Sequence, residues 1–345
     1  MILKFFNKKD NSVKIQKYEE EIKRLEEEDF SSLYNQDISY HNYGYVHTFR
    51  TISDGLRLQN VKQFSAGILA GFWISLAYVG AILASYSLGG DAWASLSKIV
   101  FSAVFAIVIV LISFLGGGFV TAHMWYNRTM FKGVERWTVF MKACGLVYLG
   151  NIIGMFIVVI IFQLSGTMTG EGNSIWEYFV HNFIEKKLYN VGHVMIAGFG
   201  LSALTSKIIL QAVLWTFMSA ILCNFLVCLA TQGSKSTKGN AVASMIMYLF
   251  ILFYFAIGGY QHCVANWFIA WMIITNAILA YQQIDNNLVW IFLLINILPS
   301  ILGNWVGALI IGYFMGIFNK EFDALLVKEA KLRFLREEVL RLKSK

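Results

Sequence analysis

Charged residues and proline are scarce in this sequence. Asp, Glu, Lys and Arg together make up 14% of its 345 residues, and there is one proline. Soluble domains carry about a quarter charged residues, so this scarcity argues against a secreted enzyme, a nucleic-acid-binding module or a disulfide scaffold. The charges are also segregated and leave six uncharged stretches: residues 63–90, 99–127, 143–170, 208–234, 239–284 and 286–319. Each reaches the roughly 20 residues that a helix needs to cross a hydrocarbon layer ~30 Å thick. The sequence therefore predicts an all-α polytopic membrane protein with six spans.

The basic residues are distributed on one side of these predicted spans. Of 28 Lys and Arg residues, 24 lie in the N-terminal segment, in residues 128–142, at Lys235 and Lys238, and in the C-terminal tail. The other four lie in the alternate loops: Lys98, Lys186, Lys187 and Lys207. The positive-inside rule then predicts a multi-pass plasma-membrane protein with both termini in the cytoplasm. It also explains the net charge of +7 without a nucleic-acid partner.

The stretch 239–284 is too long for one straight crossing. As a single helix it would extend about 69 Å, more than double the ~30 Å hydrocarbon core. Two full crossings would put the basic tail outside, so we expect one interrupted crossing. The free backbone groups at the interruption must then be buried in protein or line a cavity, because lipid cannot satisfy them.

Several chemical signatures are missing from the predicted spans. The six stretches contain no Asp or Glu and no Thr-Val-Gly-Tyr-Gly filter. A cation pathway would therefore lack ligands for its ion. There is no Walker motif, no His-Glu-x-x-His and no Gly-x-Ser-x-Gly, so we expect neither an ATP-driven pump nor another enzyme. The cysteines lie in apolar stretches without metal-ligand spacing, and we expect reduced core thiols, no metal site and no cofactor. They are Cys144, Cys223, Cys228 and Cys263. An anion or a neutral solute is the transported species that these absences favour.

A weak internal repeat divides the predicted spans into two halves. Gly150-Asn151-Ile152-Ile153-Gly154 reappears as Gly303-Asn304-Trp305-Val306-Gly307, and a glycine-interrupted apolar segment precedes each copy, at residues 115–121 and 257–262. Three spans per half make the halves inverted repeats, and broken helices in matching positions indicate a transport site at the repeat interface. The alternative is that the glycines only allow close packing, since glycine is common in membrane helices.

The second interruption carries the strongest chemical signal. His262 is the one histidine deep in an apolar span, and Gln261, Cys263 and Asn266 lie beside it. A lone histidine is usually a hydrogen-bonded core residue, but an ionisable group in a membrane cavity is a functional hypothesis. Imidazole can donate a hydrogen bond to an anion or exchange a proton with a weak acid.

Both ends of the chain are predicted to be cytoplasmic amphipathic helices. Residues 14–30 place Ile15, Tyr18, Ile22 and Leu25 at a three-four spacing, and the tail repeats the pattern from Leu325 onward. Two interpretations stay open: a helix on the protein or membrane surface, or self-association in an oligomer. The predicted organisation is an N-terminal arm (1–62), a transport domain (63–318) and a C-terminal helix (319–345).

Motifs in order along the chain resemble those of the formate/nitrite transporter family. The second half carries Asn224-Phe225-Leu226-Val227-Cys228-Leu229-Ala230, then Gly259-Tyr260-Gln261-His262-Cys263-Val264-Ala265-Asn266, then Leu298-Pro299 ahead of Gly303-Asn304. The first half carries Ala66-Gly67-Ile68-Leu69-Ala70-Gly71, Phe119-Val120-Thr121 and Gly150-Asn151. The resemblance covers residues 60–318, except for the segment around 170–206.

This resemblance implies an aquaporin-like protomer of a homopentamer, with broken helices 2 and 5 and a pore through each subunit. Its partners would be the lipid bilayer, protons and a small monovalent anion such as formate, nitrite, lactate or hydrosulfide. By the same resemblance, His262, Thr121 and Asn224 line the pore, and Lys207 is the lysine that attracts anions. Phe105 with Ile109, and Phe255, resemble the two apolar constrictions.

One departure bears on mechanism. The family usually has Phe-Glu-His-Ser where this chain has Tyr260-Gln261-His262-Cys263, which leaves the surroundings of the histidine less negative. We predict transport of formate by a proton-linked carrier or an anion channel, with nitrite, lactate or hydrosulfide as alternative substrates. An aquaporin-like channel for neutral solutes is disfavoured because neither break contains Asn-Pro-Ala. A membrane scaffold that transports nothing is the remaining alternative.

Overall fold

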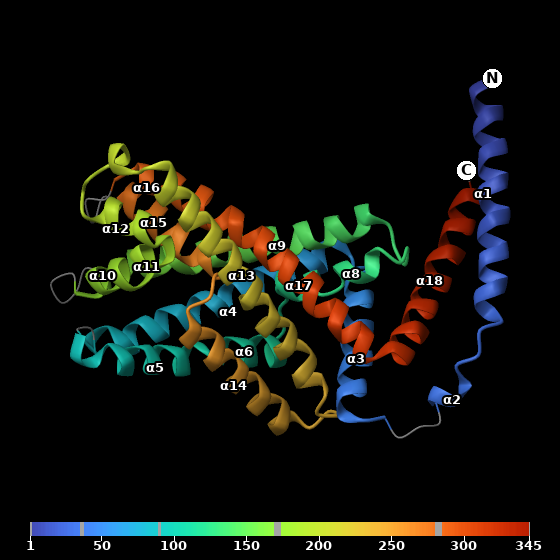
Figure 1. The fold of residues 1–345 in the computed structure, drawn as a ribbon, viewed down its shortest axis with the longest axis horizontal. Coiled ribbons are helices and arrows are strands. Elements are labelled where there is room, and N and C mark those ends of the chain that lie inside the picture. Colours follow the sequence, from blue (N-terminus) through green and yellow to red (C-terminus); the bar gives the residue numbers. More distant parts are fainter. Residues whose placement is uncertain (1, 35–37, 89–90, 169–173, 280–284, 345) are drawn as a thin grey trace.

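The computed structural model describes residues 2–34, 38–88, 91–168, 174–279 and 285–344, and the regular elements in these ranges are all helices (Figure 1). Among the described residues, six helical segments are long and apolar enough to span a membrane, as predicted. They are Asn60–Leu88 (α4, Asn60–Ser85, with η1, Tyr86–Leu88), Ala94–Leu115 (α5, Ala94–Phe105, and α6, Ile107–Leu115), Trp137–Leu164 (α9), Ser206–Lys235 (α13), Ala241–Gly258 (α14) and Asn287–Phe318 (α16, Asn287–Ile291, the π-helical η6, Phe292–Ile297, and α17, Leu298–Phe318).

Four of these segments begin a few residues before the uncharged stretches. Lys62, Lys98, Lys142 and Lys207 lie within the first six residues of α4, α5, α9 and α13, and all four side chains are exposed. A lysine can occupy the end of a membrane helix because its long stem carries the ammonium group to water. The helix boundaries therefore differ from the charge boundaries by two to six residues.

In the first half, α9 packs along α4 through the glycines of the repeated motif. A Cβ atom on Gly150 would lie 2.4 Å from the carbonyl oxygen of Phe64, and one on Gly154 would lie 2.1 Å from that of Ile68. Only glycine permits this close approach of the two backbones.

The second half repeats this packing with α17 against α13. A Cβ atom on Gly303 would lie 2.4 Å from the carbonyl oxygen of Phe217, and one on Gly307 would lie 2.5 Å from that of Ile221. The predicted correspondence of the third span with the sixth is confirmed, and both copies of the motif hold a helix pair together.

The two predicted interruptions are present. The chain is not helical at residues 116–119, between α6 and α7 (Val120–Met124), or at 259–265, between α14 and α15 (Asn266–Leu279). Gly259 ends α14 with φ +63°, in the left-handed region that favours glycine. The long stretch 239–284 thus contains two helices joined by the irregular segment 259–265. The last five residues of this stretch, 280–284, lie outside the described residues.

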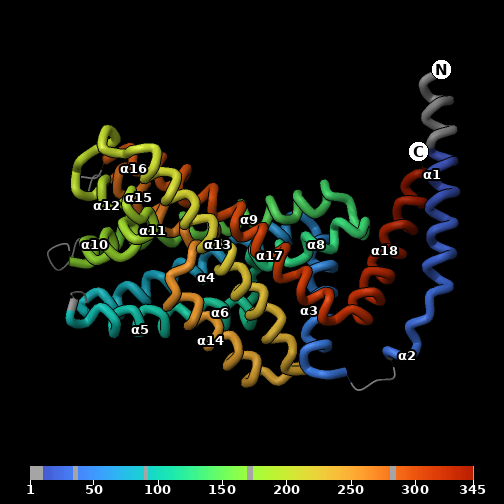
Figure 2. Tube along the Cα trace, viewed as in Figure 1, coloured from blue at the N-terminus to red at the C-terminus, as the bar shows by residue number. Residues whose placement is uncertain are grey.

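Four further helices lie at the end of the molecule where both chain termini are found (Figure 1). They are α1 (Ile2–Glu26), α2 (Ser31–Tyr34), α3 (Tyr40–Gly55) and α18 (Lys320–Lys343). Figure 2 shows α1 and α18 side by side, and ion pairs of Lys343 with Glu19 (2.7 Å) and of Arg336 with Glu26 (2.6 Å) make them antiparallel. The two predicted amphipathic helices therefore partner each other within one chain, which neither interpretation from the sequence described.

A buried ionic cluster joins α18 and α3 to the short helix α8 (Asn127–Met130), which follows α7. Arg128 lies 2.5 Å from Asp323 and donates to the hydroxyl of Tyr45 at 2.9 Å, and Lys132 donates to Asp323 at 2.7 Å. Burial raises the pKa of Asp323, but hydrogen bonds from Arg128 and Lys132 outweigh it, and the pKa is lowered overall. The carboxylate is therefore charged near neutral pH and fixes the start of α18.

A group of short helices covers the opposite end of the bundle, far from the termini (Figure 1). We call residues 174–203 the distal cap. Its elements are α10 (Ser174–Phe179), the π-helical η4 (Val180–Glu185), α11 (Lys186–Leu188), α12 (Asn190–Ile196) and η5 (Leu201–Ala203). Glu185 ties the cap together by accepting hydrogen bonds from His181 (2.8 Å) and His193 (2.9 Å).

Candidate functional site

His262 lies in the second break and faces the first. Its side chain is 3% exposed, and its Nε2 atom lies 3.0 Å from Oγ1 of Thr121, the second residue of α7. Its Nδ1 atom lies 3.0 Å from the backbone nitrogen of Ala265. A backbone N–H can only donate, so Nδ1 is the acceptor, and the proton of the neutral ring is on Nε2. The ring is thus arranged to donate a hydrogen bond toward Thr121.

The asparagine of each repeated motif holds the break of its own half. Asn151 donates from Nδ2 to the carbonyl oxygens of Gly67 and Gly118, each at 2.9 Å, and its Oδ1 accepts from the backbone of Val120 at 3.3 Å. These bonds satisfy backbone groups that the interrupted helix leaves free.

Asn304 repeats these contacts in the second half. It donates to the carbonyl oxygens of Ala220 (2.7 Å) and Gln261 (3.2 Å) and accepts from the backbone of Cys263 (2.8 Å). His262 is thereby fixed between two residues whose backbones Asn304 holds.

Asn224, on α13, lies next to the backbone of Thr121, on α7. Its Nδ2 atom donates to the carbonyl oxygen of Asn304 at 2.7 Å and lies 3.5 Å from that of Thr121, while its Oδ1 is buried and has no partner among the described residues. The structure therefore brings together three of the residues singled out from the sequence, Thr121, Asn224 and His262.

Aromatic rings lie next to His262. Phe105 and Phe255 are buried and stack with ring centroids 6.4 Å apart, and Phe255 meets His262 edge to face at 5.7 Å. Phe119, in the first break, also meets His262 edge to face, at 5.9 Å. Ile109 lies one turn after Phe105, half-buried, against the same core.

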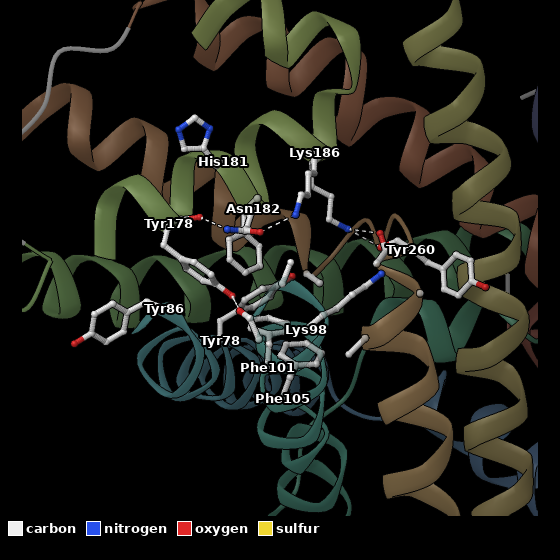
Figure 3. A pocket seen from close by; sticks show the side chains of 18 of the residues that line it. Tyr78, Tyr86, Lys98, Phe101, Phe105, Tyr178, His181, Asn182, Lys186 and Tyr260 are labelled. Carbon is white, nitrogen blue, oxygen red and sulfur yellow. Dashed lines mark hydrogen bonds between the residues drawn. The ribbon is translucent and has the colours of Figure 1, made fainter. Parts of the chain in front are cut away.

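A cavity of about 790 Å³ extends from Phe105 and Phe255 to the distal cap (Figure 3). We call it the distal cavity. Its walls come from α4, α5, α14 and the cap, and aromatic rings, Tyr78 and Phe101 among them, make up much of the lining. The cavity borders Phe105 and Phe255 and also Gly259, Tyr260 and Ala265 of the break that carries His262.

The structure separates the predicted lysine from this cavity and puts another one there. Lys207 is exposed at the start of α13 and is not among the residues that line the cavity. Lys187, in α11, does line it and donates to the carbonyl oxygens of Gly259 (3.0 Å) and Tyr260 (2.7 Å), two residues before His262. Burial lowers the pKa of Lys187 to about 8. The family resemblance pointed to Lys207 instead, and the only sequence signal for Lys187 was its place among the four lysines of the alternate loops.

Gln261 satisfies its whole amide in this environment. Its Oε1 accepts from Asn266 (2.9 Å) and Asn296 (3.0 Å), and its Nε2 donates to the carbonyl oxygen of Lys187 (3.2 Å) and the hydroxyl of Tyr189 (3.3 Å). A carboxylate could still accept from the hydroxyl of Tyr189, but it could not bond to the carbonyl oxygen of Lys187, because it has no N–H to donate. The neutral residue at this position thus fits the carbonyl that faces it.

The two inverted halves, each with a broken helix, and the cavity beside the breaks define the architecture of a membrane transport protein. A family model described as "Formate/nitrite transporter" matches residues 45–318. The chain belongs to this family. The match begins before residue 60, where the resemblance read from the motifs began, and it includes the distal cap.

Individual relatives and structures agree with this assignment. Over 272 residues the chain is 30% identical to the formate channel FocA of Haemophilus influenzae. The aligned region covers 75% of this chain and 87% of that protein. Over 246 residues it is 24% identical to the nitrite transporter NirC of Escherichia coli, which covers 68% and 81%. Among solved structures, a "Pentameric formate channel with formate bound" is similar in fold, with a TM-score of 0.58 and 22% identity over 75% of this chain and 95% of that chain.

Proposed function

We propose that this protein conducts small monovalent anions, with formate as the preferred one, through a pore that passes between Phe105 and Phe255 and reaches His262. The observation that carries this proposal is the pair of His262 and Thr121, 3.0 Å apart where the two broken helices meet. The 30% identity to a formate channel supports formate over nitrite, for which the identity to the named relative is 24%.

In this pore His262 acts as a hydrogen-bond donor. A carboxylate that arrives between the breaks can replace Thr121 as the acceptor of the Nε2 proton, with no change in the rest of the ring's contacts. Proton transfer from His262 to the anion would first require a second proton on Nδ1, and this would break the bond from Ala265 (3.0 Å). The geometry therefore supports an anion channel better than a direct proton relay.

Lys187 takes the role of attracting the anion, in place of Lys207. It lies at the second break and lines the distal cavity, whereas Lys207 is exposed outside it. Behind Lys187, the rings of Phe105 and Phe255 exclude water, with Ile109 one turn further along α6. An unpaired charge loses its hydration there, so a hydrogen bond from His262 just beyond the rings lowers the barrier.

The same proposal includes an orientation in the membrane and an oligomeric state. Both termini lie in the cytoplasm, as the distribution of basic residues indicates, so that the distal cavity opens to the outside. Five copies assemble, each with its own pore, by analogy with the pentameric formate channel of similar fold.

Uptake into proteoliposomes tests the function. We expect saturable formate uptake that exceeds uptake of nitrite, lactate and hydrosulfide and does not depend on an inward proton gradient. Replacing His262 by Ala should lower the initial rate about tenfold or more, the equivalent of one charge-assisted hydrogen bond. Uptake that rises with the gradient would instead favour the proton-linked carrier. No flux of any of the four anions, or full activity of the His262→Ala variant, would contradict the proposal.

A further inference from the structure

The distal cavity is larger than the passage of formate requires. Its volume of about 790 Å³ falls within the range of about 300–1,000 Å³ that is typical of sites for drug-sized molecules. Formate, in contrast, is a one-carbon anion. The cavity has room for a ligand with a carboxylate and a substantial apolar body.

One wall of the cavity is a cluster of aromatic rings. Phe101 stacks on Phe105 with centroids 5.7 Å apart, and Tyr78 contacts Phe101 (5.9 Å) and Phe105 (4.8 Å). Figure 3 shows these rings together on the floor of the cavity. Rings held in this way offer a rigid apolar surface on which another ring can pack edge to face or offset.

The cavity also carries an excess of positive charge. Three lysines line it, Lys98 from α5 and Lys186 and Lys187 from α11, against one carboxylate, Glu177, with His181 at the rim. Lys186 donates to the side chain of Asn182 at 2.7 Å and Lys187 donates to backbone carbonyls, so neither uses a carboxylate as its partner within the described part of the chain.

Lys98 and Lys186 lie on facing walls (Figure 3). Burial, and the nearby ammonium group of Lys98, lower the pKa of Lys186, while Glu185 acts in the opposite direction. Two like charges are thus held close to each other, and an anion between them would relieve their repulsion.

The inner end of the cavity is too narrow for an aromatic ring. The rings of Phe105 and Phe255 are nearly parallel, at 14°, with centroids 6.4 Å apart. A planar group between them, whether a ring or a carboxylate, would need about 7 Å, twice the usual carbon–carbon contact distance of about 3.5 Å, so the two rings must move apart before either can pass. A ligand with a ring is also wider than formate, so it needs the larger opening and is held in the cavity.

We propose that the distal cavity binds aromatic monocarboxylates, with the ring against Tyr78 and Phe101 and the carboxylate between Lys98 and Lys186. Such a ligand occupies the path to His262 and blocks the pore without crossing it. The block rests on the proposed function, whereas the binding does not require that the pore conducts formate.

Calorimetric titration of the detergent-solubilised full-length protein tests the binding, with benzoate as the probe. Benzamide supplies the ring without the charge, and acetate supplies the charge without the ring. We expect benzoate to bind about tenfold more tightly than either, because each control lacks one half of the recognition. Equal affinity for benzoate and acetate, or no benzoate binding, would overturn the proposal.

Charge-removing variants locate the site. Lys98→Gln and Lys186→Gln keep most of each stem, and both side chains are exposed, so the variants should fold. Each should weaken benzoate binding about tenfold, the loss of one charge-assisted hydrogen bond. Lys62→Gln removes an exposed lysine at the other end of α4, outside the cavity, and should leave binding unchanged. An equal effect of all three variants would place benzoate elsewhere.

Formate uptake with benzoate on the cavity side completes the test. Inhibition at concentrations that match the calorimetric affinity, and that shift in the lysine variants, supports a block. Benzoate binding in a protein without formate flux would leave the binding site standing and overturn the proposed function. Formate flux in a protein that does not bind benzoate would overturn the proposed benzoate site and leave the proposed function standing.

Discussion

At the scale of single residues, two hydrogen bonds decide where the proton of His262 lies. The bond from Ala265 makes Nδ1 an acceptor, and the contact with Thr121 then receives the proton on Nε2. Thr121 thus keeps a buried donor satisfied while no anion is present, and an unsatisfied donor there would cost about 1–3 kcal/mol.

Replacing Thr121 by Val removes this acceptor and leaves the shape of the side chain almost unchanged. We expect formate uptake to change at least about fivefold, because a donor without a resting partner alters the energy of the anion-free state. Thr121→Ser should restore the parent rate, since it returns the hydroxyl. Initial uptake rates in proteoliposomes measure both.

Thr216→Val is the matched control. Thr216 is fully buried on α13, and its hydroxyl has no hydrogen-bond partner in the part of the chain that the structure describes, so the same exchange removes no hydrogen bond. Uptake should stay at the parent level. Similar changes in uptake in the Thr121 and Thr216 variants would mean that packing, and not the hydrogen bond to His262, explains the effect.

The residues near the breaks differ in how far the sequence could predict them. Thr121, Asn224 and His262 lie within motifs, and the structure places them in contact or one side chain apart. Lys187 could not be found in this way, because it reaches the second break through space from the distal cap, 72 positions before Gly259. Spacing along the chain does not record such a contact.

At the scale of elements, each half depends on one close helix pair. A Cβ atom on Gly154 or Gly307 would lie 2.1 Å or 2.5 Å from a backbone oxygen of the neighbouring helix, where no flexible side chain can give way. The asparagine next to the first glycine of each motif then reaches the break. Packing of the helix pair and position of the break are thus coupled.

Gly154→Ala and Gly307→Ala should both force their helices apart. We expect each to destabilise the protein by at least about 2 kcal/mol, in the range of overpacked cores, and to lower formate uptake because Asn151 or Asn304 moves. Thermal unfolding in detergent, followed by tryptophan fluorescence, measures the stability.

Gly145→Ala, also on α9, separates packing from the general effect of an added methyl group. A Cβ atom there has open space, so alanine should stabilise the helix by about 0.5–1 kcal/mol through its higher helix propensity. If Gly145→Ala destabilised the protein as much as Gly154→Ala, the close packing of α4 and α9 would not be the cause.

Among the elements, those that cross the membrane could be predicted and those of the distal cap could not. Length and lack of charge mark the spans, and glycines mark the breaks at 116–119 and 259–265. The cap consists of short helices, one of them π-helical, whose apolar residues follow no single period. Its shape depends on contacts with the bundle, which a local pattern does not contain.

At the scale of the whole molecule, the cluster of Arg128, Asp323, Lys132 and Tyr45 connects the terminal helices to the segment that carries Thr121. Replacing Asp323 by Asn leaves Arg128 buried without a counter-ion, and we expect the packing of α18 to weaken by about 3 kcal/mol. Hydrogen exchange of α18 peptides should then be faster at pH 7. Unchanged exchange would show that α18 is held by its other contacts.

The same carboxylate sets the pH dependence of this packing. Because the folded state lowers the pKa of Asp323, its contribution is fully present above the unfolded value of about 3.9 and is lost as the pH falls through the folded value. Exchange of α18, corrected for the intrinsic rate, should stay constant from pH 8 to 5 and rise only at lower pH. In Asp54→Asn, which breaks the exposed pair with Arg333, the profile should match the parent, since exposed pairs contribute little.

The antiparallel pairing of α1 with α18 has a consequence for biosynthesis. The ribosome produces α1 before the first span and α18 after the last, so α1 has no partner while all six spans enter the membrane. Arg128 likewise waits for Asp323 until translation has passed α17. A chain that stops before α18 therefore leaves Glu19 and Glu26 of α1 without Lys343 and Arg336, and Arg128 without Asp323, so a truncated chain differs from the complete one in its unpaired charges.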